Sequence, residues 1–167
     1  MVRSAAIPPG VLASRQVQTL ESSASDVGWL INDLFSYRKE IEYEGELHNG
    51  VLVIRAFLDC DQEQALEVAG DLLASRLATF RHACDIELPA LAESLSLPAA
   101  TRAALDAYAA DLKDWLAGIL RWHQRTSRYT EAELIRRRWG QIDAVDLAAN
   151  GLPSANASAA NLSPISR

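Results

Sequence analysis

Apolar residues recur at helical spacing in two long stretches of the chain. In the first stretch they are separated by 7, 4, 3 and 4 positions, and they are Leu66, Leu73, Leu77, Phe80 and Cys84. In the second stretch the separations are 3, 4, 3, 4 and 3, and the residues are Leu105, Tyr108, Leu112, Trp115, Ile119 and Trp122. This spacing is typical of amphipathic helices. We therefore predict two long helices that pack through these faces, with the aromatic residues of the second helix in the core.

Turn and breaker residues divide the first part of the chain. Proline is tolerated in a first helical turn, so the Pro8-Pro9 pair predicts a short helix over 9–14. A second helix is predicted over 15–44, because its interior lacks proline and Gly45 is a typical helix end. The β-branched run at 51–54 favours a strand by propensity. We predict a short buried helix there instead, because the sequence on both sides is helical.

The remaining elements are also predicted to be helices. Asp61 is a typical cap for a helix that extends to about Cys84, and Leu88-Pro89 either bends it or starts another segment. The last long helix is expected over 98–129. From about residue 139 to 167 the chain is rich in Ala, Asn, Ser and Pro without apolar periodicity, which predicts a disordered tail. The predicted fold class is all-α.

Composition and charge exclude several classes of protein. The chain has 167 residues, of which 23% are charged, and a net charge of −6, which makes nucleic-acid binding a poor expectation. The basic run Arg136-Arg137-Arg138 is interpreted as a solvated helix end. No apolar run is long enough to span a bilayer, and residues 1–10 lack the apolar core of a signal peptide. Cys60 and Cys84 show no CxxC spacing and are expected to be free thiols in the cytoplasm.

A row of oxygen-bearing side chains lies in the predicted helix over 15–44. Within the run NDLFSYRKE, Asn32, Ser36 and Glu40 are four residues apart, so a helix places them on one face. Their amide, hydroxyl and carboxylate oxygens are hard donors of the kind that Mg²⁺ prefers. Small residues at Ala24 and Gly28 continue this face and would leave room beside the row.

Polar residues at this spacing more often form a solvated helix face. Here, however, Leu34, Phe35 and Tyr37 flank the row closely, so the face is not simply the wet side of the helix. Lys39 also places a cation next to Glu40, as expected where a metal and an anion bind together. From these residues alone, a metal site and a solvated face both remain open.

The same run resembles a known family motif. NDLFSYRKE fits the pattern (N/D)-D-(L/I/V)-x-(S/T)-x-x-x-E of bacterial class I terpene synthases at every defined position. Arg128-Tyr129, which follows Trp122-His123, resembles the C-terminal Arg-Tyr pair of that family. The segments EIEYEGELHNGVLV, ELPAL and DWLAGILRWH are similar to germacradienol/geosmin synthases, especially to the C-terminal of their two cyclase domains. The resemblance covers about residues 7–136.

The resemblance implies a fold, an activity and roles for individual residues. Residues 1–138 would form part of a class I terpenoid synthase-type helical bundle, incomplete because only its C-terminal half is present. The intact enzyme would ionise and cyclise a prenyl diphosphate or a related terpenoid, such as farnesyl diphosphate or germacradienol in the geosmin pathway. Asn32, Ser36 and Glu40 would bind one of three Mg²⁺ ions. The implied diphosphate ligands are Lys39, Arg128 and Tyr129.

Two parts of a complete family site are missing from the chain. There is no Asp-Asp pair, and Asp59 and Asp61 lie downstream of Asn32, whereas the family places its aspartate-rich motif upstream. Arg3 and Arg15 are too near Asn32 to serve as the family's diphosphate-sensing arginine. We therefore expect a fragment or truncated product that holds Mg²⁺ weakly, does not ionise substrate alone, and exposes apolar helix faces through which it self-associates.

Other interpretations remain open. The chain could be a non-catalytic remnant or a helical interaction module, as the missing aspartate-rich motif suggests, or a helical bundle without metal. The aromatic residues Trp29, Phe35, Phe57, Phe80 and Trp115 are available either for pocket walls or for core packing. No catalytic residue beyond the metal and diphosphate ligands is assigned.

Overall fold

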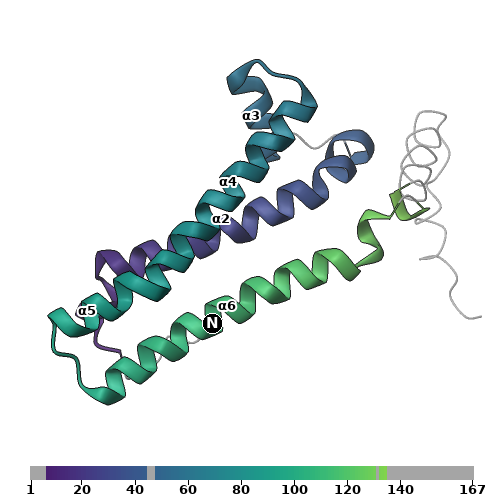
Figure 1. Ribbon diagram of the computed structural model, residues 1–167. Helices are drawn as coiled ribbons and strands as arrows, with labels where there is room; N and C mark the ends of the chain where they lie inside the picture. Colours follow the sequence, from purple (N-terminus) through teal and green to yellow (C-terminus); the bar gives the residue numbers. More distant parts are fainter. Residues whose placement is uncertain (1–6, 45–47, 131, 135–167) are drawn as a thin grey trace, which may run out of the picture. The chain divides into compact units, whose positions relative to one another are not determined.

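The structure is a computed structural model that describes residues 7–44, 48–130 and 132–134 (Figure 1). The α-helices are α1 (Pro9–Leu12), α2 (Arg15–Arg38), α3 (Gly50–Leu58), α4 (Gln62–His82), α5 (Leu88–Ser94) and α6 (Ala99–Arg125). Two π-helices, η1 (Lys39–Glu44) and η2 (Ala83–Glu87), and one 3₁₀-helix, η3 (Ser127–Tyr129), complete the list. These described segments contain helices and no strand, which confirms the all-α prediction. None of their helices is long and apolar enough to cross a bilayer.

The elements fall into two compact units. The first unit comprises Met1–Tyr37 and Leu47–Thr126, and it contains α1, α3 to α6 and nearly all of α2. The second unit comprises Arg38–Glu46 and Ser127–Arg167, and it contains η1 and η3. The predicted tail over 139–167, the basic run at 136–138 and the predicted helix end at Gly45 lie outside the described residues.

An apolar core shared by α2, α4 and α6 holds the first unit together (Figure 1). Its large members on these three helices are Val17, Leu20, Val27, Ile31, Phe80, Leu105, Tyr108, Leu112 and Leu116. Full burial of one such side chain stabilises the fold by about 1.5–3 kcal/mol. The Tyr108 hydroxyl also donates a hydrogen bond to Glu21 Oε1 at 2.6 Å, which ties α6 to α2.

The prediction that the aromatic residues of α6 fill the core is confirmed for Tyr108 and wrong for two tryptophans. Trp115 and Trp122 remain 42% and 50% exposed, whereas Leu116 is buried. The buried face continues from Leu112 to Leu116, four positions on, so Trp115 lies beside that face. Its ring edge instead covers Gly28 on α2, where an added Cβ would lie 3.1 Å from Trp115 Cη2. The space expected beside Gly28 is therefore occupied by this tryptophan.

Helix α3 confirms a helix over residues 51–54, but the predicted burial is wrong for most of it. Val51 is 1% exposed, whereas Val53 is 63% and Phe57 is 85% exposed. Only one face of α3 is covered by the described part of the chain. The helix therefore presents a row of apolar side chains at its surface.

The predicted helix starts agree with the structure better than the predicted ends. Asp61 caps α4 as predicted: its Oδ1 accepts the Gln64 amide, and the Gln64 side chain accepts the Asp61 amide, as in a capping box. Pro89 lies in the first turn of α5, so Leu88-Pro89 starts a segment. Helix α6 ends at Arg125 rather than at residue 129, because Thr126 adopts an extended conformation with a ψ of 138°.

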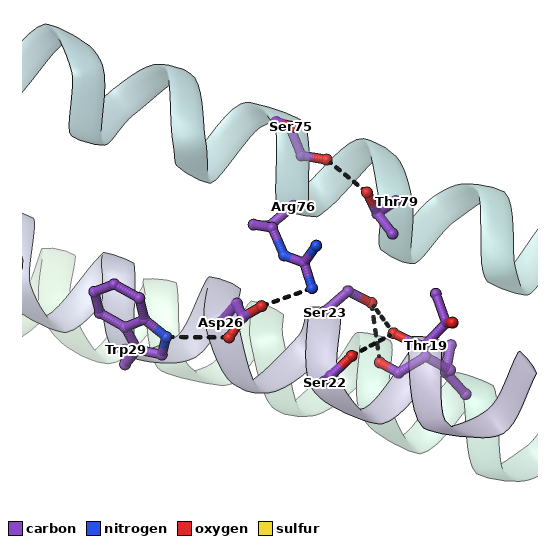
Figure 2. Close-up of polar contacts among 9 residues, drawn as sticks. Thr19, Ser22, Ser23, Asp26, Trp29, Ser75, Arg76 and Thr79 are labelled. Atoms are coloured by element: carbon purple, nitrogen blue, oxygen red, sulfur yellow. Dashed lines mark hydrogen bonds and ion pairs between the residues drawn. The ribbon is translucent and has the colours of Figure 1, made fainter. Parts of the chain in front are cut away.

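An ion pair joins α2 to α4 in the first unit (Figure 2). Arg76 Nη2 lies 2.6 Å from Asp26 Oδ2, and the Trp29 indole N–H donates to Asp26 Oδ1 at 3.3 Å. Both charged side chains are about one third exposed, at 34% and 35%. An ion pair in such a position stabilises a protein by less than about 1 kcal/mol. The pair therefore orients α4 on α2 more than it stabilises the unit.

Cys60 and Cys84 are free, as predicted. Burial raises the pKa of the Cys84 thiol above its ordinary value of 9.0; Lys113 lowers this pKa and Asp85 raises it. Because the folded-state pKa lies above the unfolded value, this thiol favours folding at neutral pH, and the contribution is lost as the pH rises through the folded pKa.

In a Cys60→Ser background we expect thiolate absorbance near 240 nm to titrate with a midpoint above 9.0. Lys113→Met should move that midpoint upward, and Asp85→Asn should move it downward. A midpoint that Lys113→Met leaves unchanged would contradict the electrostatic coupling. Urea-unfolded protein provides the reference titration.

Candidate functional site

Asn32 and Ser36 lie one turn apart on α2 in the first unit. The Asn32 side chain is exposed. Ser36 is 1% exposed, and its hydroxyl has no hydrogen-bond partner in the described part of the chain. A buried hydroxyl without a partner costs about 1–3 kcal/mol. Such an atom is a natural metal ligand, so the hydroxyl of Ser36 and the neighbouring amide of Asn32 fit the hard-oxygen donor set that was predicted.

Glu40 belongs to a different element from the other two predicted metal ligands. It lies in the π-helix η1, which follows α2 directly in the chain and belongs to the second unit. The prediction of one continuous α-helix over 15–44 is therefore wrong after Arg38. A π-helix bonds residue i to i+5 instead of i+4, and such segments occur frequently at functional sites.

The predicted diphosphate ligands all belong to the second unit. Lys39 lies in η1, and Arg128 and Tyr129 lie in η3, so one compact unit contains residues from two distant parts of the chain. Lys39 Nζ is 4.0 Å from Glu40 Oε1, which confirms that a cation lies beside this carboxylate. Lys39 and Arg128 are cationic and Tyr129 is a phenol, so all three predicted ligands in this unit are donors to phosphate oxygens.

Asp33, which follows Asn32 in the motif, joins α2 to the start of α3. Its Oδ2 accepts the backbone N–H of Gly50 at 2.6 Å. The Asn49 side chain donates to the Asp33 carbonyl at 3.0 Å, and its own oxygen caps α3 by accepting the Val51 N–H at 2.9 Å. A carboxylate at a helix N-terminus is favourable because the amides there have no partner within the helix. Asp33 therefore has a structural role, next to the predicted metal ligand Asn32.

Gly50 permits this close approach of α3 to α2. A Cβ at this position would lie 2.8 Å from Trp29 Cζ3 and 3.0 Å from Asp33 Oδ2. Any larger residue would push either the indole or the carboxylate away. The sequence marks His48-Asn49-Gly50 only as a turn, and the local pattern contains no sign that its glycine is required by Trp29.

His123 near the end of α6 also reaches the metal motif, and it was not predicted as a site residue. It is 7% exposed, and its Nε2 lies 3.4 Å from Asn32 Oδ1. The Phe35 ring lies 5.3 Å from the imidazole, centroid to centroid. Because 91 residues separate His123 from Asn32, no local spacing could have indicated this contact.

An apolar cavity of about 560 Å³ lies within the first unit, next to α2, α4 and α6. Its walls are mainly aliphatic, with Arg81, Asp85 and Lys113 among the lining residues. Of the five aromatic residues considered for pocket walls, Phe80 lines this cavity and is also part of the core. A cavity of this size and polarity is typical of sites that bind small apolar ligands.

Comparison with known proteins supports a particular class of protein. Residues 1–79 match the family model "Terpene synthase family 2, C-terminal metal binding". The matched region contains Asn32, Ser36, Lys39 and Glu40, whereas Arg128 and Tyr129 lie outside it. The matched domain implies dependence on a divalent metal.

Individual relatives extend the similarity toward the C-terminus. The chain is 34% identical over 124 residues to (−)-delta-cadinene synthase of Streptomyces clavuligerus, which covers 74% of the chain and 37% of the relative. It is 29% identical over 140 residues to pristinol synthase of Streptomyces pristinaespiralis, a match that covers 80% of the chain and 37% of the relative. The (+)-T-muurolol synthase of Roseiflexus castenholzii is 34% identical over 115 residues, a match that covers 68% of the chain and 32% of the relative. The chain thus spans about a third of the length of these relatives, and the matches support a class I terpene synthase.

Proposed function

We propose that this chain provides one wall of the active site of a class I terpene synthase, in which Asn32, Ser36 and Glu40 bind one Mg²⁺ ion. The buried hydroxyl of Ser36 carries the proposal, because a protein seldom buries such a group without a partner unless a ligand uses it. The exposed amide of Asn32 one turn earlier offers a second oxygen. Glu40 supplies the negative charge that the other two donors lack.

Lys39, Arg128 and Tyr129 are proposed to bind the diphosphate of the substrate. An arginine guanidinium can donate to two phosphate oxygens at once, and lysine adds a compact positive charge. Their common location in the second unit supports a joint role. Bound Mg²⁺ would stabilise the negative charge that develops on the diphosphate as it leaves.

The proposed substrate in the intact enzyme is a prenyl diphosphate of sesquiterpene size. The printed name of the muurolol synthase includes the words "(2E,6E)-farnesyl diphosphate cyclizing". Resemblance to germacradienol/geosmin synthases suggests farnesyl diphosphate or germacradienol as the substrate. The apolar cavity supports this choice, since a carbocation needs surroundings that exclude water. Residues 1–138 are proposed as the partial cyclase domain, which supplies ligands for one of three Mg²⁺ ions.

We expect the 167-residue chain to bind Mn²⁺ weakly, in competition with Mg²⁺, and more tightly when inorganic diphosphate is added. Glu40→Ala and Asn32→Ala should each weaken binding by more than about tenfold, because they remove metal ligands. Glu67→Ala, on an exposed part of α4, is the matched control and should leave binding unchanged. Titration followed by electron paramagnetic resonance measures the affinity. Binding that both ligand variants leave intact would refute the metal site.

The same chain is expected to form no cyclic product from farnesyl diphosphate and Mg²⁺, because the aspartate-rich motif is not in its sequence. Gas chromatography with mass spectrometry of the volatile products tests this. A cyclic terpene formed at an enzyme-like rate would show that the chain itself contains a complete site.

A second candidate function is a helical interaction module. The exposed apolar side chains of α3 favour it, with Phe57 85% exposed and Val53 63% exposed. We expect the chain to self-associate through such faces. Sedimentation velocity of the wild type and of Phe57→Ser measures this, with Glu67→Ser as the control. A monomer at all concentrations would contradict the expectation.

A further inference from the structure

The apolar cavity of about 560 Å³ in the first unit has a charged rim of its own. Among the described residues the rim consists of Arg81, Asp85 and Lys113, and the rest of the lining is apolar: Val27, Ile31, Leu73, Leu77, Phe80, Leu116, Ala117 and Leu120. The proposed metal and diphosphate ligands, all of which the structure describes, do not line it. On α2 the side chain of Asn32 points about 100° away from that of Ile31 around the helix axis. The charged rim is therefore distinct from the predicted metal motif.

The described residues of this rim carry one more positive than negative charge. Arg81 lies in the last turn of α4, and Asp85 follows four positions later in η2. Lys113 reaches Asp85 from α6: its Nζ is 3.6 Å from Asp85 Oδ1, and the two side chains are 51% and 66% exposed. The whole chain, in contrast, has a net charge of −6. The local excess of positive charge favours a ligand whose anionic group lies at the rim.

The wall behind the rim belongs to the folded core. Val27, Ile31, Phe80 and Leu116 line the cavity and are also members of the core shared by α2, α4 and α6, so the apolar surface is in place before a ligand arrives. The cavity volume lies within the range of about 300–1,000 Å³ that is typical of small-molecule sites. An apolar chain that enters removes both its own surface and the wall from water, which favours binding.

We propose that this cavity binds a single-chain amphiphile with one negative charge, of the kind represented by a fatty acid. The chain lies against the apolar wall, and the carboxylate lies at the rim near Lys113 and Arg81. A single negative charge matches the net charge of the described rim, whereas a diphosphate would bring several negative charges close to Asp85. The proposal uses the cavity that also supports an apolar substrate, but it requires no bound metal, because its residues are not the proposed metal ligands.

Calorimetric titration of the full 167-residue chain with sodium decanoate in EDTA tests the proposal without metal. Decanoate should bind about tenfold more tightly than octanoate, because two further methylenes are buried. Decyltrimethylammonium has the same chain length and the opposite charge, and it should bind at least about fivefold more weakly than decanoate. Each ligand is kept below the concentration at which it forms micelles.

Charge variants at the rim are expected to change the decanoate affinity in opposite directions. Lys113→Met and Arg81→Met should each weaken binding by about twofold to fivefold, the range expected of exposed ion pairs. Asp85→Asn should tighten binding by a similar factor, because it removes a negative charge beside the carboxylate. Arg55→Met, on an exposed position of α3, is the matched control and should leave the affinity unchanged.

Ala117→Phe tests the cavity itself. Ala117 is an exposed lining residue of α6, so a larger side chain there should occupy the space of the ligand chain and weaken decanoate binding by at least about tenfold. Circular dichroism checks that each variant is folded. The charge variants decide the proposal if Ala117→Phe does not fold, because all of their side chains are exposed.

Three results would overturn the proposal. Equal affinities for decanoate and decyltrimethylammonium would show that the rim does not select an anion. Failure of Asp85→Asn to tighten binding would place the carboxylate elsewhere. Tighter binding of farnesyl diphosphate than of decanoate in EDTA would make the rim part of the diphosphate site. A chain that binds decanoate but no Mn²⁺ would refute the proposed metal site and support the amphiphile site.

Discussion

Replacing Phe80 with alanine is expected to lower the free energy of unfolding by about 3–5 kcal/mol. Phe80 is 2% exposed, belongs to the shared core of α2, α4 and α6, and also lines the apolar cavity. Truncation removes a large buried area and enlarges an existing void that the surrounding helices cannot readily fill. Urea unfolding followed by circular dichroism measures the change. A loss comparable with total stability would appear as a chain that is already unfolded without urea.

The matched control is Phe57→Ala on α3. The same side chain is removed there, but Phe57 is 85% exposed, so the free energy of unfolding should change by less than about 0.5 kcal/mol. Leu20→Ala, also fully buried in the core, provides an independent check and should cost about 2–5 kcal/mol. Equal effects of Phe80→Ala and Phe57→Ala would contradict the arrangement of this core.

Replacing Asp33 with alanine is expected to destabilise the first unit by about 1.5–3 kcal/mol. The change removes a charged acceptor and leaves the Gly50 N–H at the start of α3 without its 2.6 Å partner. We also expect amide hydrogen exchange in α3 to accelerate, because α3 loses this bond to α2. Mn²⁺ affinity should fall as well if the position of the neighbouring Asn32 depends on the hydrogen bond between Asp33 and Gly50.

Asp26→Ala tests whether any lost carboxylate on α2 has this effect. Asp26 pairs with Arg76 at the same 2.6 Å distance, but both side chains are about one third exposed. The expected cost is below about 1 kcal/mol, and it should shrink at high salt, whereas the Asp33 effect should not. Comparable costs for the two variants at high salt would show that the bond from Gly50 is not special.

Much of the helical pattern could be predicted because it depends on neighbours in the chain. The cap at Asp61 and the proline in the first turn of α5 involve residues within three positions of each other. The ends of helices were harder to predict. At Lys39 α2 gives way to a π-helix, in which each backbone hydrogen bond spans five residues instead of four, and the sequence pattern hardly differs between the two. The exposed Trp115 was missed because periodicity indicates a face of a helix but not the width of the face that a neighbour covers.

The sequence by itself suggested the candidate chemistry, because the donors Asn32, Ser36 and Glu40 follow one another at a regular spacing along one segment that resembles a family motif. Only the tertiary structure decided what surrounds those donors. Packing of α6 on α2 brings His123 to Asn32, and Gly50 admits α3 against Asp33. These contacts join residues 17 and 91 positions apart, and they form because distant helices bury their apolar faces together. The spacing of these oxygens is local, whereas the contacts of Asn32 and Asp33 depend on how α6 and α3 pack on α2.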